Sequence, residues 1–395
     1  MVFIRTGETG KVAQQREINK TIILNGFLRY RNISRTDLAK KFNLSKSTVT
    51  RLISQLISEN MIKEVGTYSE NVGRKKVILS LNPEYRRAIS IKIGVTTSTI
   101  ARINFAMKIE SCWNFQTPED PEEFISKVIE GINILFPDIK TRIHAIGIGV
   151  PGIVDESFQK IINAPNLKWK NIPLSSLLDK KIKKIYKINL PIKMDNEANL
   201  AVIAEGMLGE KISHNDFNIV YIFIGEGIGT GLILDGKLYR GRKNTAGEFG
   251  HMVILKDGIT CKCGNKGCWE RYAGLSSPIS KELGIDLTKE EINVKNGNLL
   301  KDFAYEISIG IVNIINGLNP DVIILGGPLI NSKTVHFWEE VRKEIIENVK
   351  KYSITSEAGE VRIELTSFLN YPAELIGAGI WAFWDIFEGP VLSTI

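Results

Sequence analysis

The sequence predicts an α/β protein of two unequal parts, a small N-terminal module of helices and a hairpin followed by a larger, internally duplicated domain with a cleft between its halves. Three observations support this fold class. Residues 1–82 contain 15 Lys and Arg against 6 Asp and Glu, a balance of +9, whereas the remaining residues contain 36 against 38, a balance of −2. Apolar residues at helical spacing give way to strand-like runs after residue 87. Finally, a pattern of strand, glycine turn and strand occurs twice in the body.

Three helices are expected in the N-terminal module. Apolar residues recur at helical spacing between Glu17 and Leu28. A second helix begins at Ser34, an N-cap candidate with Asp37 three residues later, and a third begins at Ser45 after a short turn. Two short helices joined by a tight turn, the second polar at its start, indicate a helix-turn-helix.

The third helix has the composition of a recognition helix. Its first turns read SKSTVTR, in which small hydroxyl residues allow close approach to a DNA groove and the cations can contact phosphates or guanine edges. We expect four of its side chains to face DNA: Lys46, Ser47, Thr50 and Arg51.

A basic hairpin follows. Residues 62–66 and 77–81 read as two strands, and Arg74 and Lys75 lie in the basic segment between them. Such a wing can contact the backbone or minor groove of DNA. A protein-docking module or a solvated basic surface is the alternative, and the charge balance favours a polyanionic partner. The module ends at residue 82, because the residue before Pro83 is restricted away from helix.

The body is expected to fold as two similar halves, residues 83–213 and 214–395. Strands are predicted at residues 88–95, 99–105 and 143–150, with a helix at residues 121–136. A comparable unit begins with a strand at residues 218–224, followed by a glycine-rich turn and a strand at residues 231–235.

Residues 241–274 hold three of the four cysteines and one of the four histidines of the chain. A Cys-x-Cys turn presents two thiolates, and a glycine-rich stretch bends the chain back to deliver a third. With a nearby imidazole, these residues predict a four-ligand site for structural Zn²⁺, with no open position for catalysis: His251, Cys261, Cys263 and Cys268. Three unrelated buried thiols are the alternative, and a disulfide framework is disfavoured because the remainder is poor in cysteine.

This stretch resembles the signature region of the ROK family (repressor, open reading frame, kinase) of sugar kinases and sugar-responsive repressors. The motifs that carry the resemblance are Glu248–His251, Cys261–Gly264 and Gly267–Glu270. The resemblance implies that Glu248, His251 and Glu270 line a sugar pocket, with one ring nitrogen of His251 on zinc and the other on a sugar hydroxyl. It covers essentially the whole chain, and implies a winged helix-turn-helix followed by an actin-like, ribonuclease H-like two-lobed kinase fold. In the family's wing a proline follows the basic residue, and Lys76 stands there in this chain.

The motifs that serve phosphoryl transfer in the family's kinases are altered. Asn196 and Glu197 match a segment in which the second residue is the catalytic aspartate, so both are expected in the sugar site, with a longer acid at the base position. Residues 92–96 read KIGVT where kinases have Asp-x-Gly-Gly-Thr, and Glu226 replaces the threonine of Gly-Thr-Gly-x-Gly. No residue is therefore expected to be catalytic, and the chain is expected not to be an enzyme.

These inferences predict a cytoplasmic transcriptional repressor of sugar-utilisation genes, acting as a homodimer or a dimer of dimers on palindromic operator DNA. Its effector would be a monosaccharide bound by Asn196, Glu197, Glu248, His251 and Glu270. No membrane contact is expected, because the sequence has neither an apolar run of eighteen residues nor a signal peptide. Two alternatives remain: an active sugar kinase with a DNA-binding head, and a repressor that responds to a sugar phosphate or to a protein partner.

Overall fold

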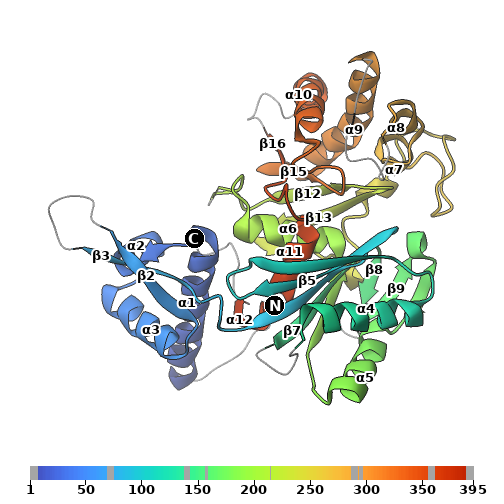
Figure 1. Ribbon diagram of the computed structural model, residues 1–395. Helices are drawn as coiled ribbons and strands as arrows, with labels where there is room; N and C mark the ends of the chain where they lie inside the picture. Colours follow the sequence, from blue (N-terminus) through green and yellow to red (C-terminus); the bar gives the residue numbers. More distant parts are fainter. Residues whose placement is uncertain are drawn as a thin grey trace.

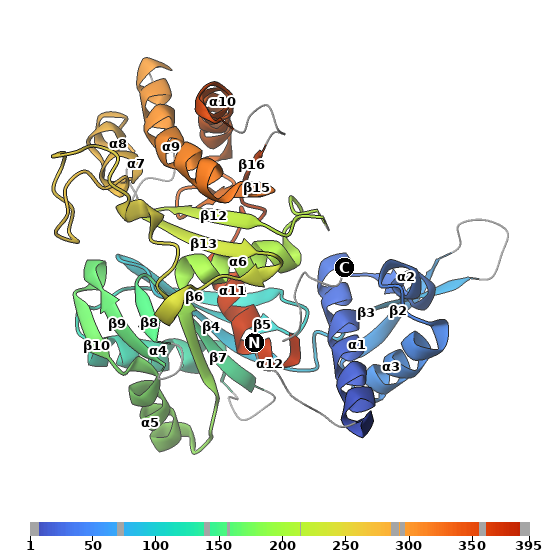
Figure 2. The same ribbon diagram turned by 180° about the vertical axis from the view of Figure 1, so that it is seen from behind.

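The structure is a computed structural model of the 395-residue chain. It describes residues 8–68, 75–137, 143–155, 159–213, 215–285, 292, 297–354 and 361–387, with side chains from Gln15 onward. A small N-terminal module lies to one side of two stacked α/β lobes (Figures 1 and 2). The predicted α/β class is therefore confirmed.

The N-terminal module combines three helices with a three-stranded antiparallel sheet of order β1-β3-β2. Its elements are α1 (Glu8–Tyr30), β1 (Ile33–Ser34), α2 (Arg35–Lys41), α3 (Lys46–Ser58), β2 (Ile62–Tyr68) and β3 (Lys76–Leu81). Ser34 is an N-cap, as predicted, and Ser45, the predicted start of the third helix, is one as well. Their hydroxyls accept hydrogen bonds from the backbone N–H groups of Asp37 and Thr48, at 3.2 and 3.1 Å. Helix α1 begins at Glu8, well before the predicted start at Glu17. The sequence did not indicate this earlier start, because the first turns of the helix are polar and show no apolar periodicity.

The first lobe is a five-stranded sheet of order β11-β7-β4-β5-β6, in which β4, β7 and β11 run parallel. Its strands are β4 (Arg87–Lys92), β5 (Thr97–Asn104), β6 (Ile109–Gln116), β7 (Ile143–Val150) and β11 (Ile192–Asn196). Helices α4 (Pro121–Leu135) and α5 (Leu174–Tyr186) share a buried core with this sheet. A small sheet lies beside it, formed by β8 (Ile153–Asp155), β9 (Lys160–Ala164) and β10 (Trp169–Ile172).

The second lobe repeats this plan with a five-stranded sheet of order β16-β15-β12-β13-β14. Its strands are β12 (Ile219–Ile224), β13 (Ile228–Leu234), β14 (Lys237–Leu238), β15 (Val322–Gly326) and β16 (Arg362–Leu365). The helices α7 (Glu270–Ala273), α8 (Pro278–Glu282), α9 (Gly297–Leu318) and α10 (Val335–Tyr352) complete it. In both lobes a glycine turn joins an antiparallel pair, and the first strand of the pair has a parallel neighbour, β7 or β15, on its other side. A further parallel strand, β11 or β16, follows in each sheet, so the predicted internal duplication is present.

Two buried helices, α6 (Glu197–Leu208) and α11 (Ala373–Ala382), lie between the sheets, and the short α12 (Trp384–Phe387) follows (Figure 1). They approach so closely that a Cβ atom on Gly377 would lie 1.9 Å from the carbonyl oxygen of Leu200. Helix α11, which comes from the C-terminal part of the chain, packs on β4 and β7 of the first lobe. Only the absence of a side chain at Gly147 allows this contact, since a Cβ there would lie 1.8 Å from the Ala378 carbonyl oxygen.

Among the described helices, none combines the length and the apolar composition needed to cross a membrane.

Candidate functional site

The four predicted metal ligands lie together. The ligand atoms of His251, Cys261, Cys263 and Cys268 are all within 4.8 Å of one another. The Sγ atoms of Cys263 and Cys268 are 3.7 Å apart, as are Cys261 Sγ and His251 Nδ1. Tetrahedral zinc with Zn–S bonds of about 2.3 Å requires sulfur atoms about 3.8 Å apart. The donor set and its spacing therefore fit zinc.

The local backbone explains how these ligands meet. His251 ends the 3₁₀ turn η3 (Phe249–His251). Val253, two residues after His251, forms a β-bridge with Cys268 and so brings that cysteine beside the histidine. Gly267 has φ +77°, and a Cβ atom at that position would lie 1.7 Å from the Leu255 carbonyl oxygen. The return of the chain that delivers Cys268 to the cluster thus requires glycine at position 267.

The protein surroundings of Cys261 by themselves favour its protonated thiol. Burial raises the pKa of the Cys261 thiol, and its hydrogen bond to Glu270 Oε1, at 2.9 Å, raises it further. A divalent cation among these atoms would reverse that balance and stabilise the thiolates.

Two carboxylates flank the His251 ring. Nε2 of His251 lies 3.8 Å from Glu248 Oε2, and Nδ1 lies 3.6 Å from Glu270 Oε1. The Glu248 side chain is 48% exposed, whereas that of Glu270 is 16% exposed. Burial raises the pKa of Glu248 against the opposing effect of His251, and Glu270 adds to the rise. The ring thus has one nitrogen on the thiol side and the other beside a solvent-accessible carboxylate.

Asn196 and Glu197 stand where β11 ends and α6 begins. The Asn196 side chain caps α6 by accepting from Ala198 N at 2.8 Å, and its amide donates to the Gly152 carbonyl oxygen at 3.0 Å. Both ends of this side chain are thus used within the fold, where they fix the backbone that presents Glu197. Burial raises the pKa of Glu197 to about 8, with a further rise from Glu374 and an opposing effect of Lys92.

The glycine turn before β13 separates these two groups of predicted sugar ligands. A Cβ on Gly227 would lie 2.3 Å from Glu270 Oε2, and one on Gly229 would lie 3.6 Å from Ala198 Cβ, beside Glu197. No hydrogen bond or ion pair in the described part of the chain joins Asn196 or Glu197 to the residues around His251. The two groups therefore border the same turn without direct contact.

A cross-lobe contact closes one side of this region. Lys262 Nζ donates to Asn166 Oδ1 at 2.9 Å, which joins the metal-binding segment to the first-lobe loop that follows β9.

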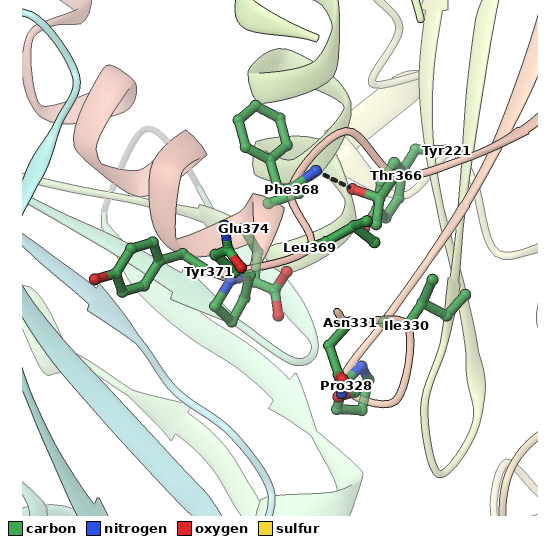
Figure 3. A pocket seen from close by; sticks show the side chains of 13 residues that line it. Tyr221, Pro328, Ile330, Asn331, Thr366, Phe368, Leu369, Tyr371 and Glu374 are labelled. Atoms are coloured by element: carbon green, nitrogen blue, oxygen red, sulfur yellow. Dashed lines mark hydrogen bonds between the residues drawn. The ribbon is translucent and has the colours of Figure 1, made fainter. Parts of the chain in front are cut away.

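An ion pair that the sequence did not reveal lies near Glu197. Lys92 Nζ lies 3.1 Å from Glu374 Oε1, and the two side chains are 12% and 1% exposed. Glu374 also lines a cavity of about 190 Å³ together with Tyr221, Asn331 and Thr366 (Figure 3). Acidic residues are favourable in the first turn of a helix because of the helix dipole, so nothing in the sequence marked Glu374 as a member of this ion pair.

A second buried ion pair lies one residue before Asn196. Asp195 Oδ2 is 2.5 Å from Arg240 Nη2, and Asp195 Oδ1 accepts from the Asn199 side chain at 3.1 Å. Neither partner stood out in the sequence, because the two residues are brought together only by the packing of the two lobes.

The two turns that correspond to the kinase phosphate turns bond to their own surroundings. Gly94 N donates to Ser98 Oγ at 3.3 Å, and Thr117 Oγ1 donates to the Gly94 carbonyl oxygen at 2.8 Å. In the second turn, Gly225 N donates to the Gly227 carbonyl oxygen at 2.9 Å. These peptide groups are satisfied within the protein.

The predicted DNA-contacting residues of α3 share its exposed face: Lys46, Ser47, Thr50 and Arg51 are exposed, whereas Val49, Leu52, Ile53 and Leu56 are buried. The Thr50 hydroxyl donates to the Lys46 carbonyl oxygen at 2.8 Å. Lys75 is exposed before β3, and Arg74 lies outside the described residues. Lys76, at the expected proline position, pairs with Asp37 of α2 at 3.2 Å and so ties the hairpin to the helices.

Comparison with known proteins gives a consistent result. The model of the ROK family matches residues 88–383, and the model of the PCI domain matches residues 8–65. The chain is 32% identical to the xylose repressor of Caldicellulosiruptor bescii, over 95% of this chain and 98% of that protein. It is also 32% identical to the xylose repressor of Bacillus subtilis, over 80% and 84% of the two chains.

Solved structures share the fold. A ROK family transcriptional regulator, a homologue of the Escherichia coli MLC protein, aligns with a TM-score of 0.71 and 22% identity, over 96% of this chain and 98% of that chain. The ROK family glucokinase of Streptomyces griseus, solved with glucose and AMPPNP, aligns with a TM-score of 0.62 and 23% identity, over 74% and 98%. The regulator thus matches the N-terminal module as well as the two lobes.

Proposed function

Since the chain belongs to the ROK family, we propose that it is a transcriptional repressor whose affinity for operator DNA changes when a monosaccharide binds in the cleft. One observation carries the proposal: a histidine, cysteine and carboxylate cluster suited to sugar hydroxyls coexists with a cleft base in which Lys92 and Glu374 neutralise each other. The 32% identity to proteins named xylose repressors makes D-xylose the first sugar to test.

Sugar recognition would use the carboxylates around His251. Glu248 and Glu270 are acceptors that can take vicinal hydroxyls, and Glu197 and Asn196 border the other side of the glycine turn. Zinc held by His251 Nδ1 and the three thiolates would fix the ring, so that Nε2 keeps one orientation toward the sugar. In this proposal the metal is structural, because protein groups fill all four positions.

DNA recognition would use the N-terminal module as a winged helix-turn-helix. The exposed side of α3 would enter the major groove with Lys46 and Arg51, while the hairpin, with Arg74 and Lys75, would follow the backbone or minor groove. A homodimer or a dimer of dimers would present the modules to a palindromic operator.

Phosphoryl transfer is not part of the proposed function. Lys92 places a cation where family kinases have an acid that serves magnesium, and Glu374 already neutralises it. The Gly94 and Gly225 peptide groups bond within the protein, and burial favours the protonated form of Glu197. An active sugar kinase remains the second candidate, because the glucokinase of S. griseus shares the fold.

The test uses the full-length, zinc-loaded protein. Thermal unfolding is followed with D-xylose, D-glucose, N-acetylglucosamine, their phosphates and Mg-ATP. A rise in Tm with one neutral sugar and none with Mg-ATP is expected, because a ligand that binds the folded state stabilises it. The variants Glu248→Gln and Glu270→Gln should lose that rise, while Glu282→Gln, an exposed glutamate outside the cluster, should keep it.

Affinity for DNA provides the second half of the test. An operator duplex is selected from a random library by the unaltered protein, and its Kd is measured with and without the sugar. A tenfold change corresponds to about 1.4 kcal/mol of coupling. ADP formation with any sugar would instead favour the kinase, and a response to sugar phosphates alone would favour an anionic effector.

A further inference from the structure

Helix α6 reaches from the cleft to the N-terminal module. Its first residue is Glu197, at the cleft, and its last turn contains Gly206. With 12 residues, the helix is about 18 Å long. At its far end, the Gly206 carbonyl accepts a hydrogen bond from Arg29 at 3.4 Å, and the carbonyl of Ile212, in the segment that follows the helix, accepts a second at 2.7 Å. Arg29 belongs to the last turn of α1 in the N-terminal module.

The position of Arg29 has a clear electrostatic basis. The last carbonyls of a helix lack partners within the helix and carry its partial negative charge. The Arg29 guanidinium is partly buried at this end of α6, where it donates to one carbonyl of the last turn and to one in the segment just beyond it. Asn25, one turn earlier on α1, donates to the Phe387 carbonyl oxygen at 3.4 Å. The same side of α1 therefore holds both α6 and the end of α12.

Helix α6 can transmit a displacement because it is buried and closely packed against its neighbours. Every residue from Ala198 to Met207 is buried. Gly377 of α11 lies against one side, where an added Cβ would be 1.9 Å from the Leu200 carbonyl oxygen, and Gly231 of β13 lies against another, 2.1 Å from that of Ala198. A close-packed helix moves as a unit with its contacts rather than deforming along its length.

Another contact holds α6 near the end that Arg29 binds. Glu205 Oε1 accepts hydrogen bonds from Ser367 N, at 2.9 Å, and from the Thr366 hydroxyl. Thr366 lines the cavity that also contains Glu374 (Figure 3). The segment of α6 beside Arg29 is thus also hydrogen-bonded to a residue that lines this cavity.

We propose that Arg29 is the positioning residue through which sugar occupancy changes the orientation of the N-terminal module. This inference rests on the proposed function. A sugar that contacts the Glu197 end shifts α6 and the segment after it, and the two hydrogen bonds from Arg29 carry the shift into α1. Helix α1 is in turn joined to α3 and its C-cap by hydrogen bonds from Arg16 to Gln55, at 2.6 Å, and from Lys20 to Glu59, at 3.0 Å. The sugar must bind one orientation more tightly than the other for this shift to change the affinity for DNA.

The test compares Arg29→Gln with Arg31→Gln in the full-length, zinc-loaded protein. Both variants remove one positive charge from the same module, but Arg31 is exposed. Three quantities are measured: the change in Tm with D-xylose, the Kd for the selected operator without sugar, and the ratio of operator Kd values with and without D-xylose. Arg29→Lys keeps the charge without the paired donors.

Arg29→Gln is expected to bind D-xylose as the unaltered protein does. Its operator affinity without sugar should match that of Arg31→Gln within about threefold, while a sugar-dependent ratio of about tenfold or more should fall below about threefold. Arg29→Lys should give an intermediate ratio, and Arg31→Gln should keep the full ratio.

An unchanged ratio in Arg29→Gln would overturn the role of Arg29 while leaving the proposed function intact. The absence of any D-xylose response in the unaltered protein would count against D-xylose as the effector and remove the basis of the inference with it. Should Arg29→Gln not fold, amide hydrogen exchange of the unaltered protein decides: D-xylose must change exchange at residues 25–31 and 206–213, and a change confined to the cleft overturns the inference.

Discussion

The ammonium group of Lys92 and the carboxylate of Glu374 form an ion pair, 3.1 Å apart, where β4 of the first lobe meets the first turn of α11. Both side chains are largely buried, and both charges act on the pKa of the nearby Glu197, which Glu374 raises and Lys92 lowers. The pair also links the start of α11, which lines the cavity of Figure 3, to β4.

Replacing Lys92 by Met should destabilise the protein by about 3 to 5 kcal/mol, because it leaves the Glu374 carboxylate buried without a partner. The double variant Lys92→Met, Glu374→Gln should recover most of that loss, since no unpaired charge remains. Urea unfolding of the two variants and the unaltered protein measures both effects. Equal stability of the single and double variants would show that the pair is not coupled.

Removal of bound zinc should lower Tm by about 5 to 10 °C, which for a domain of this size corresponds to about 2 to 3 kcal/mol. The expected metal content is one zinc per chain, measured by atomic absorption. Cys263→Ser should lose the metal and show the same lower Tm with or without chelator. Cys112→Ser changes the exposed thiol outside the cluster and should retain zinc. Full zinc content in Cys263→Ser would contradict the assigned ligands.

Glu205 gives the protein a pH-dependent stability. Burial raises its pKa from 4.5 to about 7, although the hydrogen bonds from Thr366 and Ser367 oppose the rise. The folded state therefore binds this proton more tightly than the unfolded state. Its stabilising contribution is complete below about pH 4.5 and is lost as the pH rises through about 7.

Glu205→Gln removes this titration. When the pH rises from 4.5 to 8, the unaltered protein loses the contribution of Glu205 and the variant does not. The free energy of unfolding of the variant should therefore rise by about 3 kcal/mol relative to that of the unaltered protein, since one pKa unit corresponds to about 1.4 kcal/mol. Urea unfolding at the two pH values tests this. Glu210→Gln, an exposed residue just beyond α6, should show no such change, and parallel pH profiles for all three proteins would refute the assignment.

Arg51→Gln and Lys46→Gln should each weaken binding to a 30-bp duplex of arbitrary sequence and make it less sensitive to salt. A lost phosphate contact lowers the slope of log K against log salt concentration by about 0.9. Fluorescence anisotropy at graded salt concentrations measures the slope. Lys184→Gln changes an exposed lysine of α5 in the first lobe and should leave the slope unaltered. Identical slopes for all variants would exclude this face of α3 from the interface.

The sequence by itself determined what depends on local spacing. Ser34 and Ser45 marked helix starts because capping involves only the next turn, and the four metal ligands were identifiable because three of them lie within eight residues. The duplicated order of strands followed from two glycine turns between apolar runs. Strand β6 and the small sheet of β8, β9 and β10 were missed, because they are short or partly polar and gain their stability from neighbours distant in the chain.

Tertiary structure alone decided how distant residues meet. The return of α11 to the first lobe depends on Gly147 and Gly377, whose missing side chains admit the helix, and no local pattern encodes that approach. The same packing pairs Lys92 with Glu374, residues 282 positions apart in the sequence numbering. It also sets Arg29 against the last turn of α6 and the segment that follows it. Such contacts arise from the close packing of whole elements, whereas a sequence pattern reports only what neighbours along the chain prefer.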